Sequence, residues 1–380
     1  MSLDAAYPSL TDLRRKARRR VPKFVWEYLD SATGAETTQA RSRAALDRIG
    51  FLPSVLHGEV TPQLATQLFS ETLALPFGVA PVGMSGLIWP GAERALARAA
   101  AKAGLPYCLS TVAAASPEDV APELGPHAWF QLYPPRDPEM RADMLRRAKH
   151  AGFGTLVLTV DVPAPSRRER QTRSGLTSPP VLTPRLALQC ALRPRWSFET
   201  LRAGRPRMRT LDPYIDEAQK GLPPNAHVGY LLRAAPDWDY LRWLRDAWRG
   251  PFIVKGVLRA ADARKLEAEG VDAIWVSSHA GRQFDAAPAT IALLPALRKA
   301  TTLPLIVDSG FETGLDILRA FALGADHVML GRAWHIALAA LGPEAGPAHL
   351  VHILSEDMKA NMGQLGARDL ASLPRTVTLT

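Results

Sequence analysis

The sequence predicts a (β/α)8 barrel with an N-terminal helical extension and one long loop after the fourth strand. Short apolar runs rich in β-branched and aromatic residues recur along the chain, and a helical pattern follows each of them. Their hydrophobic residues are continuous rather than alternating, as in parallel strands that are buried on both faces. Eight such units over roughly 260 residues are typical of a closed barrel, and an open doubly wound sheet is the competing architecture.

The first half of the barrel is predicted from four apolar runs and their helices. The runs lie at residues 75–81, 106–110, 128–133 and 155–160. Ala and Leu recur at helical spacing over 91–104, and Gly104 is expected to end that helix. A second helix should begin at Ser116, because a cap-type serine precedes Pro117 there, and a third should span about 137–151.

The second half repeats the same alternation. Its apolar runs lie at residues 251–256, 273–278, 303–310 and 326–331. Each is followed by a helical segment, for example 259–270 after the fifth run. We expect a single domain over 1–380, with the N-terminal extension at 1–70, the barrel at 71–342, and a C-terminal helix and tail at 343–380.

One connection is much longer than the others. Residues 162–235 separate the fourth strand from its helix at about 236–248, and a loop of that length in a compact domain is usually functional or disordered. Within it, residues 167–209 contain 11 Arg and two Glu, which accounts for the whole formal charge of +9. The same loop carries an apolar segment at 186–196. We expect it to cover the active site and to contact an acidic partner or an anionic membrane surface; a solvated loop with scattered charge is the alternative.

Composition excludes several classes of protein. A hydrophobic share of 47% and a charged share of 22% are ordinary for a globular chain and exclude a disordered one. No apolar run approaches the ~18 residues of a membrane-spanning helix, and the N-terminus has no secretory pattern. Two cysteines, Cys108 and Cys190, support neither a disulfide framework nor a cysteine zinc site, so we expect a cytoplasmic protein without a metal. Walker and dinucleotide-binding fingerprints are missing from the sequence.

Polar residues follow the predicted strands, at the face where such barrels hold their active sites. His279 comes after the sixth strand, and Asp161 after the fourth is placed to orient it as a general base. Arg168 and Arg282 offer forked donors that match a carboxylate. Lys255 ends an apolar strand, where burial requires an anionic partner or a functional reason.

The ends of the seventh and eighth strands predict a phosphate site. The sequences VDSG at 307–310 and MLGRA at 329–333 bring glycines, backbone amides and Arg332 to the corner where this fold commonly binds phosphate. A phosphorylated cofactor or substrate is therefore expected.

At these residues the chain resembles the FMN-dependent L-2-hydroxy acid oxidising family, which includes glycolate oxidase, L-lactate dehydrogenase and (S)-mandelate dehydrogenase. The resemblance runs almost end to end, through the segments EYLDSATGAE, WFQLY, LVLTVDVP, RRER, VKGVL, SSHAGRQ, DSGF and GADHVMLGR. The segments LRPRWSFE and YLRWLRDAW resemble the mandelate dehydrogenase branch in particular.

The resemblance implies FMN as the cofactor and assigns roles to the strand-end residues. His279 would take the proton during oxidation of the hydroxyl-bearing carbon, with Asp161 stabilising the imidazolium. Arg282, Arg168 and Tyr28 would hold the carboxylate, Tyr133 would bond the hydroxyl oxygen, and Lys255 would stabilise the reduced flavin. The flavin would be lined by Ala80, Ser110, Gln131, Thr159 and Ser277, and its ribityl phosphate held by Asp308, Gly310, Gly331 and Arg332.

Three positions depart from the family pattern. Ser278 replaces the usual Asn before the histidine, and Ala280 replaces the usual Gly after it, two substitutions that could shift the histidine loop. Glu312 stands where the family carries an Arg that helps to bind the phosphate. A carboxylate there repels a phosphate unless it turns away or pairs with a neighbouring Arg, so weakened FMN retention is expected.

Three functions remain open at this point. The first is a dehydrogenase that passes electrons from a 2-hydroxy acid to a quinone and contacts the inner face of a membrane through residues 167–209. The second is an oxidase that uses dioxygen, and the third is a catalytically impaired barrel that acts as a binding protein. The resemblance also implies a homo-oligomer, commonly a tetramer. Nucleic-acid binding is not expected, because the chain shows no recognition module.

Overall fold

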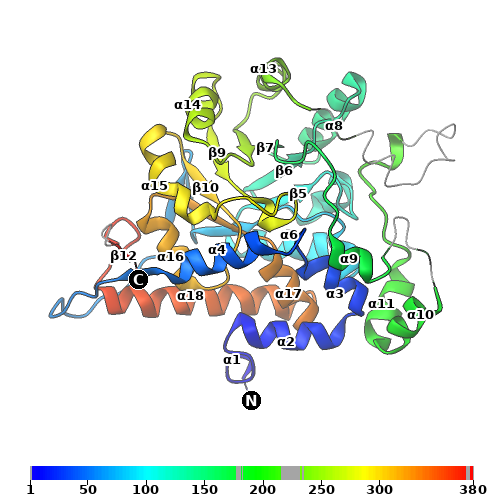
Figure 1. The fold of residues 1–380 in the computed structure, drawn as a ribbon, viewed down its shortest axis with the longest axis horizontal. Helices are drawn as coiled ribbons and strands as arrows, with labels where there is room; N and C mark the ends of the chain where they lie inside the picture. Colours follow the sequence, from blue (N-terminus) through cyan, green and yellow to red (C-terminus); the bar gives the residue numbers. More distant parts are fainter. Residues whose placement is uncertain are drawn as a thin grey trace.

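The computed structural model is built around a closed barrel of eight parallel strands (Figure 1). It describes residues 2–176, 181, 183–214, 232, 235–373 and 377–379. The barrel strands are β4 (Phe77–Val79), β5 (Tyr107–Ser110), β6 (Ala128–Leu132), β7 (Thr155–Thr159), β8 (Phe252–Lys255), β9 (Ala273–Val276), β10 (Leu305–Val307) and β11 (His327–Leu330). Each strand pairs with the next along the chain, and β11 closes the barrel on β4. The predicted barrel is confirmed, with every strand inside its predicted range.

The barrel strands are buried on both faces, which explains their continuous apolar sequences. Their outward side chains pack against the surrounding helices in the main core, and their inward side chains form a separate cluster. Trp129 and Trp275 meet edge to face inside the barrel, with ring centroids 6.2 Å apart. Side chains therefore fill the barrel interior, and any ligand site must lie above them at the strand ends.

Helices follow the strands in the predicted order. They are α6 (Ala92–Ala103), α7 (Pro117–Val120), α8 (Pro138–His150), α13 (Trp238–Ala247), α14 (Ala260–Ala268), α15 (Thr290–Ala300), α16 (Gly314–Ala322) and α17 (Arg332–Leu341). Ser116 caps α7 in a reciprocal capping box with Asp119, as its sequence predicts, but α7 has only four residues and continues as the short turn η1 (Ala121–Glu123). Thr313 and Asp316 form the same arrangement at the start of α16.

The N-terminal extension is helical and lies against the barrel. It contains α1 (Leu3–Ala6), α2 (Leu10–Arg20), α3 (Lys23–Asp30) and α4 (Thr37–Asp47), followed by β1 (Ile49–Phe51) and β2 (Thr66–Leu68). Strand β2 forms a hairpin with β3 (Glu71–Leu73), which begins the barrel segment, and α5 (Ser85–Ile88) comes after β4. Helix α2 packs on α17 through the fully buried Leu13 and Ala17. The C-terminal helix α18 (Ala345–Leu365) also packs on α17, and β12 (Val377–Leu379) pairs with β1.

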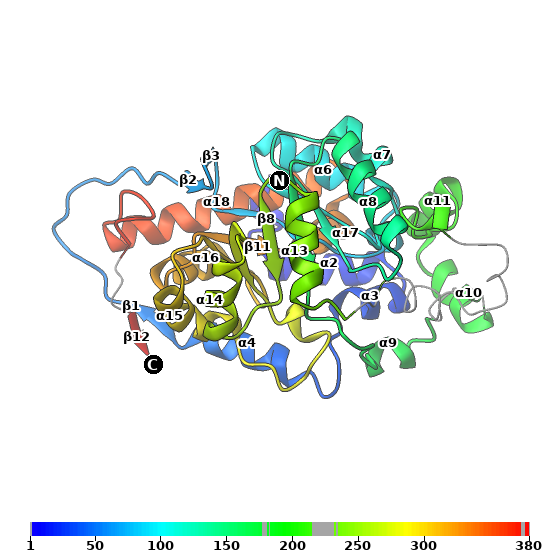
Figure 2. The ribbon, with the colours of Figure 1, turned by 90° about the horizontal axis from the view of Figure 1, so that it is seen from above.

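The long connection after β7 contains helices rather than an irregular loop. They are α9 (Glu169–Arg173), α10 (Pro184–Ala191), α11 (Pro194–Ala203) and the turn η2 (Asp212–Tyr214). The apolar segment at 186–196 joins α10 to α11, and both views place these helices at one end of the molecule, away from the barrel axis (Figures 1 and 2). The remainder of the connection, at 177–180, 182, 215–231 and 233–234, lies outside the described residues. None of the helices in the described ranges is long and apolar enough to cross a membrane.

The barrel core predicts a loss of stability in mild acid. His327 on β11 is fully buried beside Trp129, and neither ring nitrogen has a hydrogen-bond partner among the described residues. Burial lowers its pKa from 6.5 to about 3, so between these values the unfolded chain binds a proton that the folded chain does not. Above pH 6.5 this residue therefore adds no pH dependence to the free energy of unfolding. Below pH 6.5 the free energy of unfolding falls, by about 2 kcal/mol at pH 5, because protonation favours the unfolded chain.

Urea unfolding of the wild type and of His327→Leu at pH 7 and pH 5 measures this contribution. The variant should lose about 2 kcal/mol less between the two pH values than the wild type. Equal pH dependence in both proteins would contradict a neutral, buried His327.

Candidate active site

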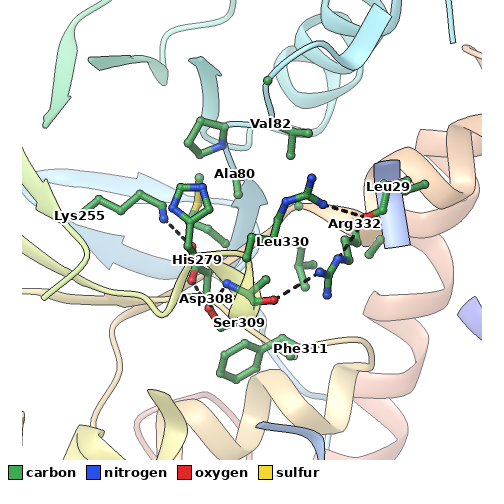
Figure 3. A pocket seen from close by; sticks show the side chains of 18 of the residues that line it. Leu29, Ala80, Val82, Lys255, His279, Asp308, Ser309, Phe311, Leu330 and Arg332 are labelled. Carbon is green, nitrogen blue, oxygen red and sulfur yellow. Dashed lines mark hydrogen bonds and ion pairs between the residues drawn. The ribbon is translucent and has the colours of Figure 1, made fainter. Parts of the chain in front are cut away.

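A cavity opens at the carboxyl ends of the barrel strands, as the fold class predicts. Its lining includes the predicted residues Tyr28, Ala80, Tyr133, Arg168, Lys255, His279, Arg282, Asp308, Gly310, Gly331 and Arg332. Lys255 and His279 lie on one side of it and Arg332 on the other, beside Leu29 (Figure 3). Predicted residues at the ends of seven barrel strands, or in the segments that follow them, therefore converge with the N-terminal extension on one space.

His279 is oriented by a carboxylate. Its Nδ1 lies 3.1 Å and 3.2 Å from the two carboxylate oxygens of Asp161, and its Nε2 lies 3.4 Å from the hydroxyl of Tyr133. An ionised carboxylate only accepts hydrogen bonds, so Nδ1 carries the proton of the neutral ring and the Nε2 lone pair is left available. This arrangement can accept a proton at Nε2.

The pKa values of this pair favour that protonation state. Burial lowers the pKa of His279, and the nearby Asp161 only partly offsets it. Burial opposes the charge of Asp161, but His279 and Lys255 hold the pKa of this carboxyl below its ordinary value. Near neutral pH the imidazole is therefore uncharged and the carboxylate ionised.

The histidine loop has a strained backbone that a neighbouring serine holds in place. His279 and Ala280 have φ of +53° and +52°, the left-handed region that a non-glycine residue occupies only at a cost. The hydroxyl of Ser309 holds the loop by accepting from the amides of Ser278 and Ala280, at 3.2 and 3.0 Å. The side chain of His279 meets Asp161 in this loop conformation. A shift of the loop relative to the family stays a prediction.

Two arginines and a tyrosine approach the cavity from different elements. Arg168 precedes α9, and its Nε donates to the hydroxyl of Ser166 at 3.2 Å. Nη1 of Arg282 donates to the carbonyls of Tyr28 and Ser31, at 2.8 and 3.2 Å. Burial and the charge of Arg168 lower the pKa of Arg282, so an anion shared by the two guanidinium groups would relieve an unfavourable pairing.

Tyr28 is anchored to the wall of the cavity. Its hydroxyl donates to the carbonyl of Gly83 at 2.7 Å, and its ring lies 5.3 Å from the Arg282 guanidinium. Tyr28 therefore holds Arg282 in place and links α3 to the loop after β4.

Lys255 is buried and has anionic partners, as the sequence requires. Its Nζ donates to Ser277 at 2.7 Å and lies 3.3 Å from a carboxylate oxygen of Asp308. Burial opposes the charge, but Asp308 and Asp161 hold the pKa of Lys255 above its ordinary value. The same Asp308 oxygen accepts from the indole Nε1 of Trp275 at 3.0 Å. Trp275 was not predicted as a site residue; it lies on β9 directly opposite Lys255 on β8.

Buried polar atoms next to the cavity test whether a flavin fits there. Nε2 of Gln131 and Oγ1 of Thr159 are buried without a hydrogen-bond partner in the part of the chain that the structure describes. The other end of the Gln131 amide accepts from Ser110 at 2.9 Å, which fixes the orientation of its NH2 group. Buried polar groups are rarely left unpaired, so a donor and a hydroxyl at the strand ends fit a ligand with polar ring atoms, such as an isoalloxazine.

The opposite side of the cavity combines Arg332 with an unexpected ion pair. Arg332 donates to the carbonyls of Leu29 and Ser31, at 3.2 and 3.0 Å. Glu312 also lines the cavity, and its carboxylate accepts from Nη2 of Arg14 on α2. The Glu312 carboxylate therefore pairs with an arginine rather than turning away from the cavity, which is one of the two ways to relieve its repulsion of a phosphate.

The fold and the cavity are those of a barrel enzyme that binds a flavin, and comparisons with known proteins support this class. The family model of FMN-dependent dehydrogenases matches residues 17–379. L-lactate dehydrogenase of Caulobacter vibrioides is 40% identical over 375 residues, which cover 97% of each chain. L-lactate dehydrogenase of Stenotrophomonas maltophilia is 40% identical over 373 residues, which cover 96% of this chain and 97% of that protein. The chain therefore belongs to the FMN-dependent dehydrogenase family, which confirms the predicted FMN cofactor and oxidoreductase class.

Solved structures agree with this assignment. The structure of the monotopic membrane protein (S)-mandelate dehydrogenase superposes with a TM-score of 0.92 at 34% identity, covering 98% of this chain and 99% of that one. A mandelate oxidase with bound (S)-2-phenylpropionate superposes with a TM-score of 0.81 at 32% identity and the same coverage. The family, its 2-hydroxy acid chemistry and the barrel fold are thus supported by independent comparisons, whereas the roles of individual residues stay predictions.

The geometry around His279 predicts the effect of Asp161→Asn. Loss of the carboxylate removes the negative charge that favours the imidazolium, so the pKa of His279 should fall further below its ordinary value. Ring-carbon chemical shifts of selectively labelled histidines, followed against pH, measure this change. The buried His335 is an internal control whose titration should be the same in both proteins, and an unchanged or raised pKa of His279 would contradict the proposed pair.

Proposed function

We propose that this protein oxidises an L-2-hydroxy acid to the 2-oxo acid, with His279 as the base. The observation that carries the proposal is the available Nε2 of His279, which faces the cavity while Asp161 occupies Nδ1. Near it lie groups suited to a hydroxy acid: guanidinium groups for the carboxylate and the Tyr133 phenol for the hydroxyl. Such a set favours an active enzyme over a binding protein.

FMN, when bound, accepts the two electrons that leave the hydroxyl-bearing carbon. The residues of this chain position the substrate and handle its proton. Arg168 and Arg282 bind the carboxylate and fix which hydrogen faces the cofactor, while Nε2 of His279 takes the hydroxyl proton. Asp161 then stabilises the imidazolium, and Tyr133, whose pKa burial raises to about 12, stays protonated and donates to the substrate oxygen.

Lys255 has an electrostatic role in this proposal. Its ammonium is buried at the strand ends, next to Ser277 and on the same side of the cavity as His279 (Figure 3). A fixed positive charge in a site of low dielectric stabilises negative charge that develops beside it. We infer that it favours the reduced, anionic cofactor.

The test of this function is anaerobic reduction of the bound flavin. Lactate, mandelate, glycolate and longer 2-hydroxy acids are mixed with the yellow holoprotein, and the loss of flavin absorbance is followed by stopped flow. His279→Ala should reduce the rate on the order of 10²–10⁴-fold, because the hydroxyl proton then has no acceptor. His352→Ala is the matched control, since His352 is half-exposed on α18 and lies outside the cavity. Equal rates for His279→Ala and the wild type would reject His279 as the base.

We also propose that helices α10 and α11 contact a membrane surface and that a quinone there accepts the electrons. One side of this pair is anchored: the indole of the buried Trp196 donates to the carbonyl of Ile88 at 3.1 Å and meets Phe24 edge to face. The other side exposes Leu188, Leu192, Phe198 and Leu201 among arginines. Exposed apolar side chains flanked by cations suit an anionic interface. Dioxygen as an alternative acceptor, and a tetrameric assembly, stay predictions from the resemblance.

Vesicle binding tests the membrane contact. Replacing Leu192 and Leu201 together by glutamate should weaken co-sedimentation with anionic phospholipid vesicles roughly tenfold or more, because two apolar groups are lost and two negative charges gained. Leu56→Glu is the control, since Leu56 is fully exposed in the loop at the opposite end of the molecule (Figure 2). Binding that is insensitive to the double substitution, or equally sensitive to Leu56→Glu, would contradict the proposal.

A further inference from the structure

The phosphate side of the cavity lacks the guanidinium that the resemblance leads one to expect after β10. Glu312 occupies that position and lines the cavity. A guanidinium group from a different part of the chain lies on this side instead: Arg14 on α2 donates to the Glu312 carboxylate. Nη1 of Arg14 also lies 3.6 Å from a carboxylate oxygen of Asp30. Arg14 and Glu312 come from elements almost 300 residues apart, so their pairing depends on how α2 is docked.

The position of Arg14 is set by the packing of α2. Leu13, its neighbour, and Ala17 one turn further are fully buried against α17, the helix that begins at Arg332. This docking fixes the backbone of Arg14 relative to Arg332. The electrostatics agree: burial is the main reason that the pKa of Arg332 is lowered, and Arg14 lowers it further while Asp30 and Glu312 raise it. All four groups therefore lie within electrostatic reach of one another.

We propose that Arg14 supplies the second guanidinium for the FMN phosphate, in place of the arginine that Glu312 has replaced. The inference rests on the proposed position of the FMN phosphate next to Arg332. Arg14 does not itself line the cavity, but it pairs with Glu312, which does. In this proposal the phosphate shares that guanidinium when FMN binds. With Arg14, the four groups Arg14, Arg332, Glu312 and Asp30 carry no net charge, whereas without Arg14 they would carry one net negative charge and repel the dianion.

The exposure of the pair distinguishes it from an ordinary surface salt bridge. The Arg14 and Glu312 side chains are only 29% and 35% exposed, compared with 74% for Arg15, which pairs with Asp12 on the same helix. A partly buried guanidinium next to a cavity is screened less by solvent, so it interacts more strongly with a phosphate than an exposed one does. Arg15 is thus a matched control from the adjacent position.

The experiment compares FMN with riboflavin, which lacks the phosphate. Holoprotein is diluted or stripped of flavin, and dissociation constants for both flavins are measured by quenching of flavin fluorescence. Arg14→Gln should weaken the binding of FMN about tenfold and leave the binding of riboflavin unchanged, because only the phosphate loses a charge-assisted hydrogen bond. Glu312→Gln should tighten the binding of FMN several-fold, because the carboxylate that competes with the phosphate for Arg14 is removed. The binding of riboflavin should again be unchanged. Arg15→Gln should change neither constant.

Unchanged FMN affinity in Arg14→Gln would overturn this inference and leave the proposed function intact. An equal loss of FMN and riboflavin affinity would also overturn it, because Arg14 would then support the fold rather than the phosphate. A wild-type protein that binds neither flavin would instead reject the proposed function itself. Arg14→Lys adds a further check: it keeps the charge and should recover part of the FMN affinity lost in Arg14→Gln.

Discussion

The site depends on mutual neutralisation of charges buried at the carboxyl end of the barrel. Lys255 lies 3.3 Å from Asp308. Lys255 and His279 together hold the pKa of Asp161 below its ordinary value. A charge left unpaired at such a position costs several kcal/mol, so these groups are arranged as a set rather than singly. The same balance leaves the His279 imidazole neutral and oriented, which is the property that a general base requires. The charge pairs that allow these groups to be buried therefore also set the protonation states that the proposed reaction requires.

Much of the fold was predictable because local sequence patterns encode it. Barrel strands such as 155–160 and 273–278 are continuous apolar runs, and the strand ends carry the polar residues, so most of the expected residues line one cavity. The exceptions are Ser110, Gln131, Thr159, Asp161 and Ser277, which do not line it. Contacts that depend on distant elements were not predictable. Arg282 donates to the backbone carbonyl of Tyr28, and Arg14 pairs with Glu312; no local pattern specifies backbone acceptors or the docking of α2. The short α7 also differs, because a cap marks where a helix starts but not its length.

The departures from the family pattern show how this chain tolerates substitution at its site. Ala280 adopts a left-handed conformation that costs an alanine ~1–2 kcal/mol, and the two hydrogen bonds that Ser309 accepts from the loop help to offset it. Glu312 is accommodated by Arg14 in the same way. In both cases a neighbouring side chain contacts the substituted position. Compensation of this kind explains why the substitutions need not signify loss of activity.

The central claim is that Arg168 and Arg282 share one carboxylate beside His279. The most direct measurement is a crystal structure of the FMN-loaded protein with a bound 2-oxo acid. We expect the carboxylate between the two guanidinium groups, the oxo oxygen within hydrogen-bond distance of the Tyr133 hydroxyl and facing Nε2 of His279, and Asp161 still bonded to Nδ1. A ligand whose carboxylate contacts neither arginine, or a His279 ring turned away from Asp161 and the ligand, would contradict it.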